Sequence, residues 1–199
     1  MSQVAVPPAP WDLQGECLVA VVRRPAAAAG LPAGLQPLPG WCVLVAARYA
    51  RSPVGPYLEL ALCQPARAGG RAGLCVTTMV VDSPESRLGG RSNWGFPKEL
   101  GKLSWTAEEG QRSLRWDDRG LEVRGPTSGL AVPVWAPVRA LQRRDDGAVV
   151  VPGRLQGSAR PGLVTVEVPA DDALAPMGGT RAGAFVSGLR LVVEPARPA

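Results

Sequence analysis

The chain has 199 residues, of which 46% are hydrophobic and 20% are charged. This length and balance fit one folded domain and exclude a disordered chain. The net charge of +5 does not indicate a nucleic-acid partner, because the arginines occur singly or in pairs with acidic residues between them. We predict one domain over residues 1–199, with an extended arm at 1–10 and a tail at 195–199.

The first half of the chain alternates short apolar runs with segments rich in glycine and proline. Strands are expected over Cys17–Arg23, Trp41–Tyr49, Tyr57–Cys63 and Gly73–Asp82. The sequence also predicts one or two helical turns over Pro25–Gly30 and a short helix over Ser83–Gly90. Loops are expected over 1–16, Leu31–Gly40 and Pro65–Gly73.

The second half continues with short strands at close intervals. They are expected over Leu103–Thr106, Ser113–Trp116, Leu121–Arg124, Leu130–Trp135, Ala148–Val151, Leu163–Val168 and Leu189–Val193. Asp117–Gly120 and Arg144–Gly147 have the composition of hairpin turns. The whole pattern predicts an all-β or β-dominated α+β fold, built as a curled or barrel-like sheet.

The chain contains no histidine, which excludes several classes of enzyme. Ser-His-Asp and Cys-His mechanisms cannot be built, and most catalytic zinc and histidine-ligated iron sites are excluded with them. Neither nucleotide-binding glycine motif is present. We therefore expect no metal and no organic cofactor, so that acid–base chemistry falls to Lys, Asp, Glu, Tyr or Cys.

The N-terminal residues lack the features of a signal peptide, and no apolar run reaches the ~18 residues that cross a bilayer. We expect a cytoplasmic protein without a membrane partner. The four cysteines each lie within an apolar run and none belongs to a CxxC pair. In a reducing compartment they are predicted to be small buried hydrophobic residues.

Lysine is confined to one segment of the chain. The two lysines, Lys98 and Lys102, lie within Trp94–Lys102, and the other twenty basic residues are arginines. An arginine stays protonated in protein sites, whereas burial disfavours the charged form of a lysine and can leave it a nucleophilic amine. Codon bias could also have left two lysines by chance, so a functional role for them needs support from other residues of the chain.

Two motifs resemble those of the acetoacetate decarboxylase superfamily. The first is Ser-Pro-Val-Gly-Pro-Tyr-Leu-Glu at residues 52–59, and the second is Gly-Arg-Ser-Asn-Trp-Gly-Phe-Pro-Lys at residues 90–98. The resemblance is strong from Arg48 to Leu100 and rests on β-richness alone beyond residue 110. The chain looks like a short form of the family, which is expected to have lost part of its C-terminal half. The fold that the resemblance implies is a β-dominated α+β fold, built as the curled antiparallel double sheet or cone-like β-barrel of that family.

The resemblance implies an amine catalyst. Lys98 would form a Schiff base with a β-keto acid or a related ketone, and the iminium would accept electrons as carbon dioxide leaves. Glu59 would bind the substrate or carry a proton. Tyr57, Trp94, Phe96 and Arg91 would surround the amine, although Arg91 is expected to stabilise the turn rather than to touch substrate. Lys102 has no counterpart and is predicted to be a solvated surface lysine.

Three positions depart from the family pattern. Glu99 stands where the family often has a second lysine, and its side chain should point away from Lys98 if the segment is extended. A second family glutamate falls at Leu44, and a carboxylate-binding arginine falls at Glu16. These losses argue against acetoacetate itself as the substrate. Decarboxylation of another β-keto acid and an aldol or dehydration reaction both remain open.

The alternative function is a non-catalytic homologue that binds a small molecule or has a structural role. It is favoured by the missing polar partners and by the short chain. In that case Lys98 would be a partly exposed turn lysine, and Glu59 would pair with Arg48 or Arg91. Under either function, the family implies a homo-oligomer, and the expected ligand is a small keto acid or ketone.

Overall fold

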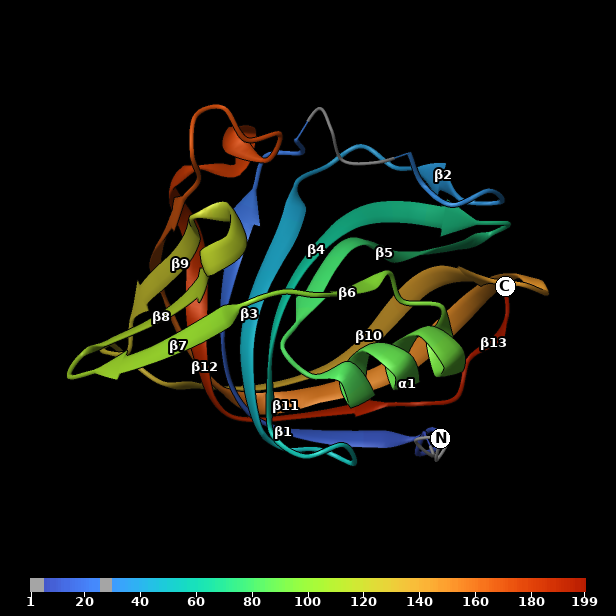
Figure 1. Ribbon diagram of the computed structural model, residues 1–199, viewed down its shortest axis with the longest axis horizontal. Helices are drawn as coiled ribbons and strands as arrows, with labels where there is room; N and C mark the ends of the chain where they lie inside the picture. The colour runs from blue at the N-terminus through green and yellow to red at the C-terminus, as the bar shows by residue number, and fades with distance from the viewer. Residues whose placement is uncertain (1–5, 26–29) are drawn as a thin grey trace.

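The computed structural model describes residues 6–25 and 30–199, and within them thirteen strands form one sheet beside one α-helix (Figure 1). The strands are β1 (Trp11–Val22), β2 (Gln36–Pro37), β3 (Cys42–Arg51), β4 (Tyr57–Ala68), β5 (Arg71–Val81), β6 (Lys98–Leu100), β7 (Leu103–Glu108), β8 (Gln111–Trp116), β9 (Leu121–Pro126), β10 (Val132–Arg144), β11 (Gly147–Glu167), β12 (Gly179–Val193) and β13 (Arg197–Pro198). The helix is α1 (Pro84–Trp94), and the short 3-10 turns are η1 (Asp117–Arg119) and η2 (Ala175–Met177). The predicted β-dominated fold is therefore confirmed.

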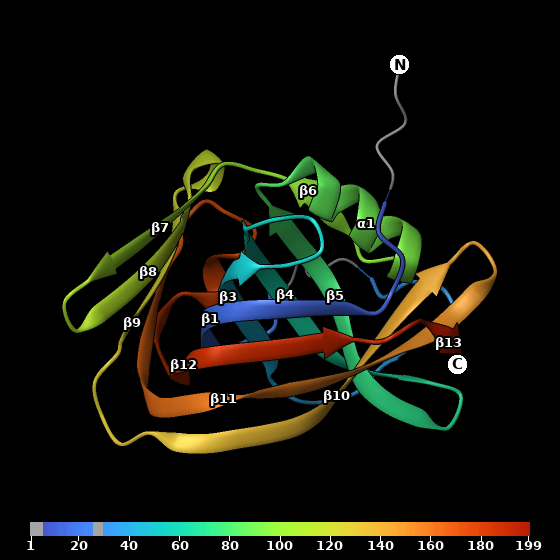
Figure 2. The same cartoon turned by 90° about the horizontal axis from the view of Figure 1, so that it is seen from below.

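The sheet curls until its ends meet. Its order is β10-β5-β4-β3-β1-β12-β11-β9-β8-β7, and β10 also pairs with β11 along its whole length. The strands from β10 round to β11 therefore form a ring, which Figure 2 shows from below. The ring closes at one parallel bridge, where Ala140 of β10 meets Leu74 of β5.

Two hydrophobic cores lie on opposite faces of β1, β3 and β4. The inner core is enclosed by the ring and contains Tyr57 and Ala61 of β4 together with Trp11, Trp94 and other residues of the surrounding strands. The outer core contains Leu60 and Leu62 and is covered by β8, β9 and η2. Because side chains alternate along a strand, Glu59 faces the inner core with Tyr57.

Several strands are longer than the sequence predicted. β1 begins at Trp11 rather than Cys17, and a bulge between Gly15 and Cys17 lets it continue through the polar turn that was expected there. The expected loop at residues 65–73 is instead the end of β4 and the start of β5. β4 tolerates Pro65 because pairing with β3 has already ended at Cys63, so no partner there requires the missing N–H.

Prolines and glycines in the second half of the chain lie within long strands, where the sequence predicted shorter strands. β10 contains Pro133 and Pro137 but extends to Arg144, and β11 spans 21 residues across Pro152 and Pro161. The two strands pair from Gly147 to Ala159 without a break, because ladder pairing overrides weak local propensity. The hairpin turns expected at 117–120 and 144–147 do join neighbouring strands. The helical turns predicted at 25–30 fall largely on residues 26–29, outside the described residues.

The helix α1 runs four residues beyond its predicted end. It begins after Ser83, whose hydroxyl accepts a hydrogen bond from the backbone N–H of Ser86 at 3.0 Å, and Pro84 opens its first turn. It ends at Gly95, which adopts a φ of 73° while its N–H donates to the Arg91 carbonyl at 2.9 Å. The motif Gly90–Lys98 therefore begins in the last turns of α1 and ends at the first residue of β6.

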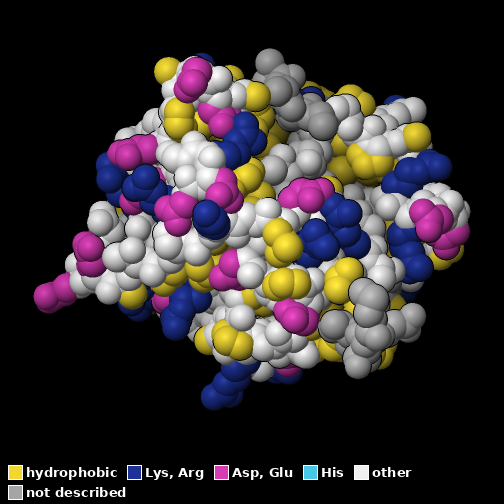
Figure 3. All heavy atoms as spheres, in the orientation of Figure 1, with side chains coloured by type: hydrophobic (Ala, Val, Ile, Leu, Met, Phe, Trp, Pro, Cys, Tyr) yellow, Lys and Arg dark blue, Asp and Glu magenta, His cyan; other side chains and the backbone are white. Residues whose placement is uncertain are grey.

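The surface carries mixed charge. Figure 3 shows that Lys and Arg side chains on this face are interspersed with Asp and Glu and do not form a continuous basic stripe. Ion pairs such as Arg119–Asp172 and Arg190–Asp12 account for part of this mixture. Over residues 6–25 and 30–199, no helix combines the length and the apolar character needed to span a bilayer.

The end of α1 should be intolerant of a side chain at residue 95. A Cβ there would lie 2.2 Å from the Arg143 carbonyl oxygen, and alanine also disfavours the positive φ. We expect Gly95→Ala to lower the free energy of unfolding by at least about 2 kcal/mol in urea denaturation. Gly55→Ala is the control, because its φ is 83° and no described atom lies within 4 Å of an added Cβ. Equal losses in the two variants would contradict this packing argument.

Candidate active site

The side chain of Lys98 is buried at the start of β6, beside the inner core. The residue is 3% exposed, and its Nζ donates hydrogen bonds to Glu59 Oε2 at 2.8 Å and to Ser86 Oγ at 2.9 Å. The nitrogen also lies 5.0 Å from the centre of the Tyr57 ring. Glu59 is itself only 5% exposed, so the two groups form a buried ion pair.

The position of Lys98 is set through its backbone. β6 runs parallel to β5, with Lys98 opposite Met79. Arg91 of α1 donates from Nε to the Lys98 carbonyl at 2.7 Å and pairs through a second nitrogen with Glu99. The arginine thus ties the last turn of the helix to the strand that carries the amine, which is the turn-stabilising role expected of it.

The aliphatic part of the Lys98 side chain packs against α1 at Gly90, where the helix has no side chain. An added Cβ on Gly90 would be 2.6 Å from both Cδ and Cε of Lys98. Only glycine leaves that space free, so the stem can extend along α1 toward Ser86. This close approach explains in physical terms why the motif has a glycine before Arg91.

The turn between β3 and β4 places Glu59. Ser52 Oγ accepts from the Val54 N–H at 3.1 Å, and Gly55 completes the turn with a φ of 83°. The register that results sets Ala47 opposite Glu59 and Tyr49 opposite Tyr57. Tyr49 then donates from its hydroxyl to Glu59 Oε1 at 3.4 Å, on the far side of the carboxylate from Lys98.

Two opposing effects act on the buried pair. Burial disfavours the charged forms of an amine and a carboxyl group, while each group favours the charge of the other. For the two neighbouring tyrosines the two largest effects act in one direction. Desolvation is the largest and the charge of Glu59 the next, and both raise the pKa of Tyr49 and Tyr57 well above the ordinary value. Both hydroxyls stay protonated, and that of Tyr57 is buried without a hydrogen-bond partner among the described residues.

Trp94 and Phe96, which were also expected around the amine, pack against other aromatic rings of the inner core. Trp94 packs edge-on against Trp11 at 5.1 Å and donates from its indole nitrogen to the Glu194 carbonyl at 2.8 Å. Phe96 packs against Trp94 at 5.7 Å within the inner core. These rings build the wall behind α1, whereas Tyr57 is the aromatic ring beside the nitrogen.

Ser86 is the site residue that the sequence did not reveal. It is fully buried and lies twelve positions before Lys98, on the same face of α1 as Gly89 and Gly90. A signal was available, since serine at the third position after the Ser83 cap has no capping role of its own. Its partner could be identified only once the path of the chain from α1 to β6 was known.

The three departures from the family pattern all lie away from the amine. The Glu99 side chain is 65% exposed and paired with Arg91. Leu44 belongs to the outer core, on the opposite face of the sheet from Glu59. Glu16 pairs with Arg48 and Arg112, each at 3.5 Å. The alternative partners of Glu59, Arg48 and Arg91, are therefore bound to other acids.

The cysteines are unsuited to nucleophilic chemistry. Cys17, Cys42 and Cys75 are buried as predicted, while Cys63 is half-buried. Desolvation raises the pKa of Cys17, Cys63 and Cys75 to about 12, so their thiolates are scarce at neutral pH. Among the described residues, no three His, Cys, Asp or Glu side chains come together as metal ligands.

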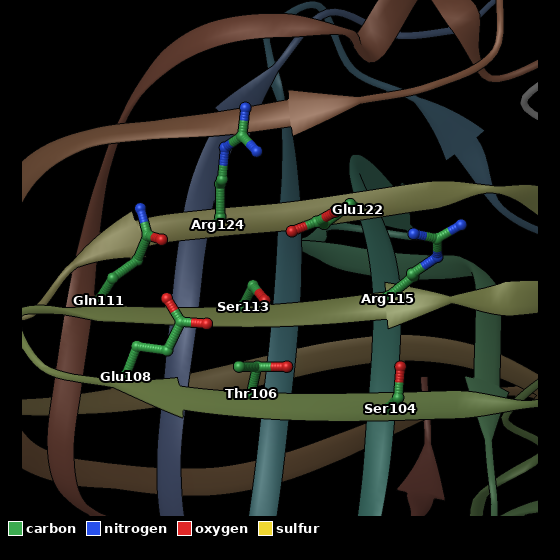
Figure 4. A pocket seen from close by; sticks show the side chains of 8 residues that line it. All are labelled: Ser104, Thr106, Glu108, Gln111, Ser113, Arg115, Glu122 and Arg124. Carbon is green, nitrogen blue, oxygen red and sulfur yellow. The ribbon is translucent and has the colours of Figure 1, made fainter.

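Two surface hollows lie apart from this pair. One of about 350 Å³ covers the outward face of β7, β8 and β9, where Figure 4 shows Glu108, Arg115, Glu122 and Arg124 among serine, threonine and glutamine side chains. The other, of about 380 Å³, lies between the end of α1 and the β10–β11 turn, beside Arg91. Neither is lined by Lys98 or Glu59.

A model of the family described as acetoacetate decarboxylase matches residues 1–172. A search of the curated proteins found no match.

Solved structures share the fold at low identity. Acetoacetate decarboxylase from Legionella pneumophila is 21% identical with a TM-score of 0.73, over 99% of this chain and 92% of that one. The enduracididine biosynthesis enzyme MppR complexed with pyruvate is 18% identical with a TM-score of 0.72, over 98% and 92%. An acetoacetate decarboxylase-like enzyme from Sphingomonas wittichii is 19% identical with a TM-score of 0.66, over 96% and 92%.

Removing the Ser86 hydroxyl should destabilise the buried pair. In Ser86→Ala the Lys98 amine keeps Glu59 but loses its second acceptor in a site with little access to water. We expect the free energy of unfolding to fall by about 1–3 kcal/mol in urea denaturation. The control is Ser92→Ala, an exposed serine of the same helix, which should cost less than about 0.5 kcal/mol. A loss at residue 86 no larger than at residue 92 would show that the hydroxyl does not support the lysine.

Proposed function

The chain belongs to the acetoacetate decarboxylase family, and we propose that it is a Schiff-base-forming lyase that acts on a β-keto acid or a related ketone. The single observation that carries this proposal is the Lys98 amine, buried and hydrogen-bonded to Glu59 at 2.8 Å. Burial disfavours the ammonium form of the lysine, and the adjacent carboxylate can take its proton, so the pair can supply a neutral amine nucleophile.

The proposed reaction begins with a proton transfer. Lys98 gives a proton to Glu59 across their hydrogen bond, which leaves a neutral amine and a neutral carboxylic acid. The amine attacks the carbonyl carbon, the oxygen receives one proton from the attacking nitrogen and one from Glu59, and it leaves as water. The resulting iminium withdraws electrons from the adjacent bond that is to be broken. Hydrolysis of the iminium then frees the product and restores Lys98.

Two reactions fit this intermediate. Loss of carbon dioxide from a β-keto acid would follow the activity in the family's name. An aldol or dehydration reaction is the second, and a structure of MppR holds the condensation product of pyruvate and imidazole 4-carboxaldehyde. Both begin with the same bond to Lys98, so the test of the proposed function is the formation of that bond.

The alternative is a non-catalytic member of the family. It is favoured by the positions of Leu44 and Glu16, where the resemblance implied polar substrate contacts and where the side chains lie in the outer core and in surface ion pairs. In that case, incubation with a ketone and cyanoborohydride would leave Lys98 unmodified.

We also propose that the protein acts in the cytoplasm as a homo-oligomer. Free cysteines support a reducing compartment. The first half of β10 exposes Val132 and Trp135, with Leu130 just before it, and such apolar side chains suit contact with another copy. Cell fractionation and sedimentation velocity test the two statements, and a protein that sediments only as a monomer would contradict the second.

The lysine itself gives the first test. Lys98→Arg should fold, because arginine preserves the charge next to Glu59, but it cannot form an imine. We expect no reductive trapping of a ketone at residue 98 and no turnover, as measured by peptide mass spectrometry and by product formation. Lys102→Arg is the matched control and should keep both activities, since Lys102 is exposed. Turnover retained in Lys98→Arg would refute the mechanism.

The proton acceptor gives the second test. Glu59→Gln can still accept a hydrogen bond from Lys98, but it cannot take its proton. We expect the rate of imine formation to fall by ~10²–10⁴. Glu109→Gln, at an exposed hairpin position, should leave the rate unchanged. If the rate for Glu59→Gln equalled that of the unmodified protein, Glu59 would be a structural residue alone.

A further inference from the structure

We propose that the carbonyl compound received by Lys98 is uncharged, a neutral ketone or aldehyde rather than a keto acid, so that the lyase reaction is of the aldol type and releases no carbon dioxide. This inference rests on the proposed function, because it specifies the substrate of the same lysine. It is carried by the charges and hydrogen-bonding groups that face the amine.

The buried part of the molecule contains one positive and one negative side chain. Among the described residues, Lys98 is the only basic side chain that is buried, and Glu59 is the only acidic one. The arginines keep part of their surface in solvent, and two of them, Arg48 and Arg91, pair with Glu16 and Glu99. Residues 1–5 and 26–29, outside the described part, include no arginine or lysine.

A neutral substrate preserves this balance of charge. When Lys98 becomes an iminium, the positive charge stays on the same nitrogen and remains paired with Glu59. A carboxylate would add a second negative charge near Glu59, with no further buried cation to meet it. Burying an unpaired charge is strongly unfavourable, so the site discriminates against an acid.

The remaining polar groups suit an uncharged oxygen. The Tyr57 hydroxyl makes no hydrogen bond of normal geometry among the described residues, although Ser86 and Glu59 lie near enough to shift its pKa, and its ring lies 5.0 Å from Lys98 Nζ. Because desolvation raises its pKa, it remains a hydrogen-bond donor at neutral pH. A donor that lacks a partner beside the amine is suited to a carbonyl or hydroxyl oxygen of the substrate.

The corresponding lyase step can be written for a neutral β-hydroxy ketone. Once the ketone is an iminium on Lys98, Glu59 takes the proton of the β-hydroxyl group and the bond between the α and β carbons breaks. The electron pair of that bond moves into the iminium to give an enamine, while the hydroxyl carbon leaves as an aldehyde. Glu59 then returns the proton to the enamine carbon, and water releases the shorter ketone from Lys98.

The test compares two ketones that share one carbon skeleton and differ in charge and by one ester methyl group. The probes are 4-oxopentanoate and its methyl ester, neither of which loses carbon dioxide, and each is incubated with the whole protein and cyanoborohydride. The rate of adduct formation at Lys98 is divided by the rate at the exposed Lys102, which corrects for the reactivity of each probe. We expect the corrected rate to be at least ~10-fold higher for the ester, the ratio that about 1.4 kcal/mol of discrimination produces.

The charge of Glu59 should control that ratio. In Glu59→Gln both probes should react slowly. The preference for the ester should fall at least ~3-fold, because the negative charge of residue 59 is gone and the carboxylate of the acid can pair with the positive charge of Lys98. A ratio that Glu59→Gln leaves unchanged would overturn the charge argument.

The outcomes separate the two proposals. A corrected rate for the acid that equals or exceeds that for the ester would overturn the neutral substrate and leave Schiff-base formation intact. If neither probe labels Lys98 faster than Lys102, the proposed function fails, and the neutral substrate fails with it.

Discussion

The contact between the Lys98 amine and the Glu59 carboxylate, 2.8 Å apart and almost without solvent, is the constraint around which the rest of the site is built. Such a pair contributes little net stability, since desolvation offsets the attraction, yet removing one partner costs about 3–5 kcal/mol. A fold that carries it must therefore hold both groups in place by other means. Here the support comes from the turn before β4, from the end of α1 and from the hydrogen bond to Ser86.

The backbone around Lys98 makes that support rigid. The Gly95 cap ends α1 against the β10–β11 hairpin, and Arg91 joins the helix to the Lys98 carbonyl. The strand β6 is short, but its parallel pairing with β5 fixes which face each of its side chains occupies. Lys98 therefore points inward and Glu99 outward, although the two are adjacent in sequence and both could carry charge. The site is thus a property of the junction between helix and sheet.

The sequence was most informative where function and local geometry coincide. Both site motifs contain glycine and proline at turns, and these turns lead into the strands that carry Glu59 and Lys98. Prediction failed where pairing between distant strands overrides local preference, as in β11 across Pro152 and Pro161. It also missed Ser86, because an isolated serine in a short helix becomes informative only when its spatial neighbour is known. Long-range pairing and single hydrogen bonds are the features that composition and periodicity do not encode.

The positive net charge of the chain does not conflict with a neutral substrate. The +5 charge is carried by guanidinium groups at the surface, several of them paired with acids, and their field is screened over about 8 Å at physiological salt. Such a field can speed the approach of an anion, but it does not repay the desolvation of a carboxylate beside Glu59. Affinity at the amine is set by the groups that touch it, and those are one carboxylate, one serine and one tyrosine ring. The positive surface is therefore compatible with the proposed preference of Lys98 for a neutral carbonyl compound, because that preference would be set by the buried groups beside the amine.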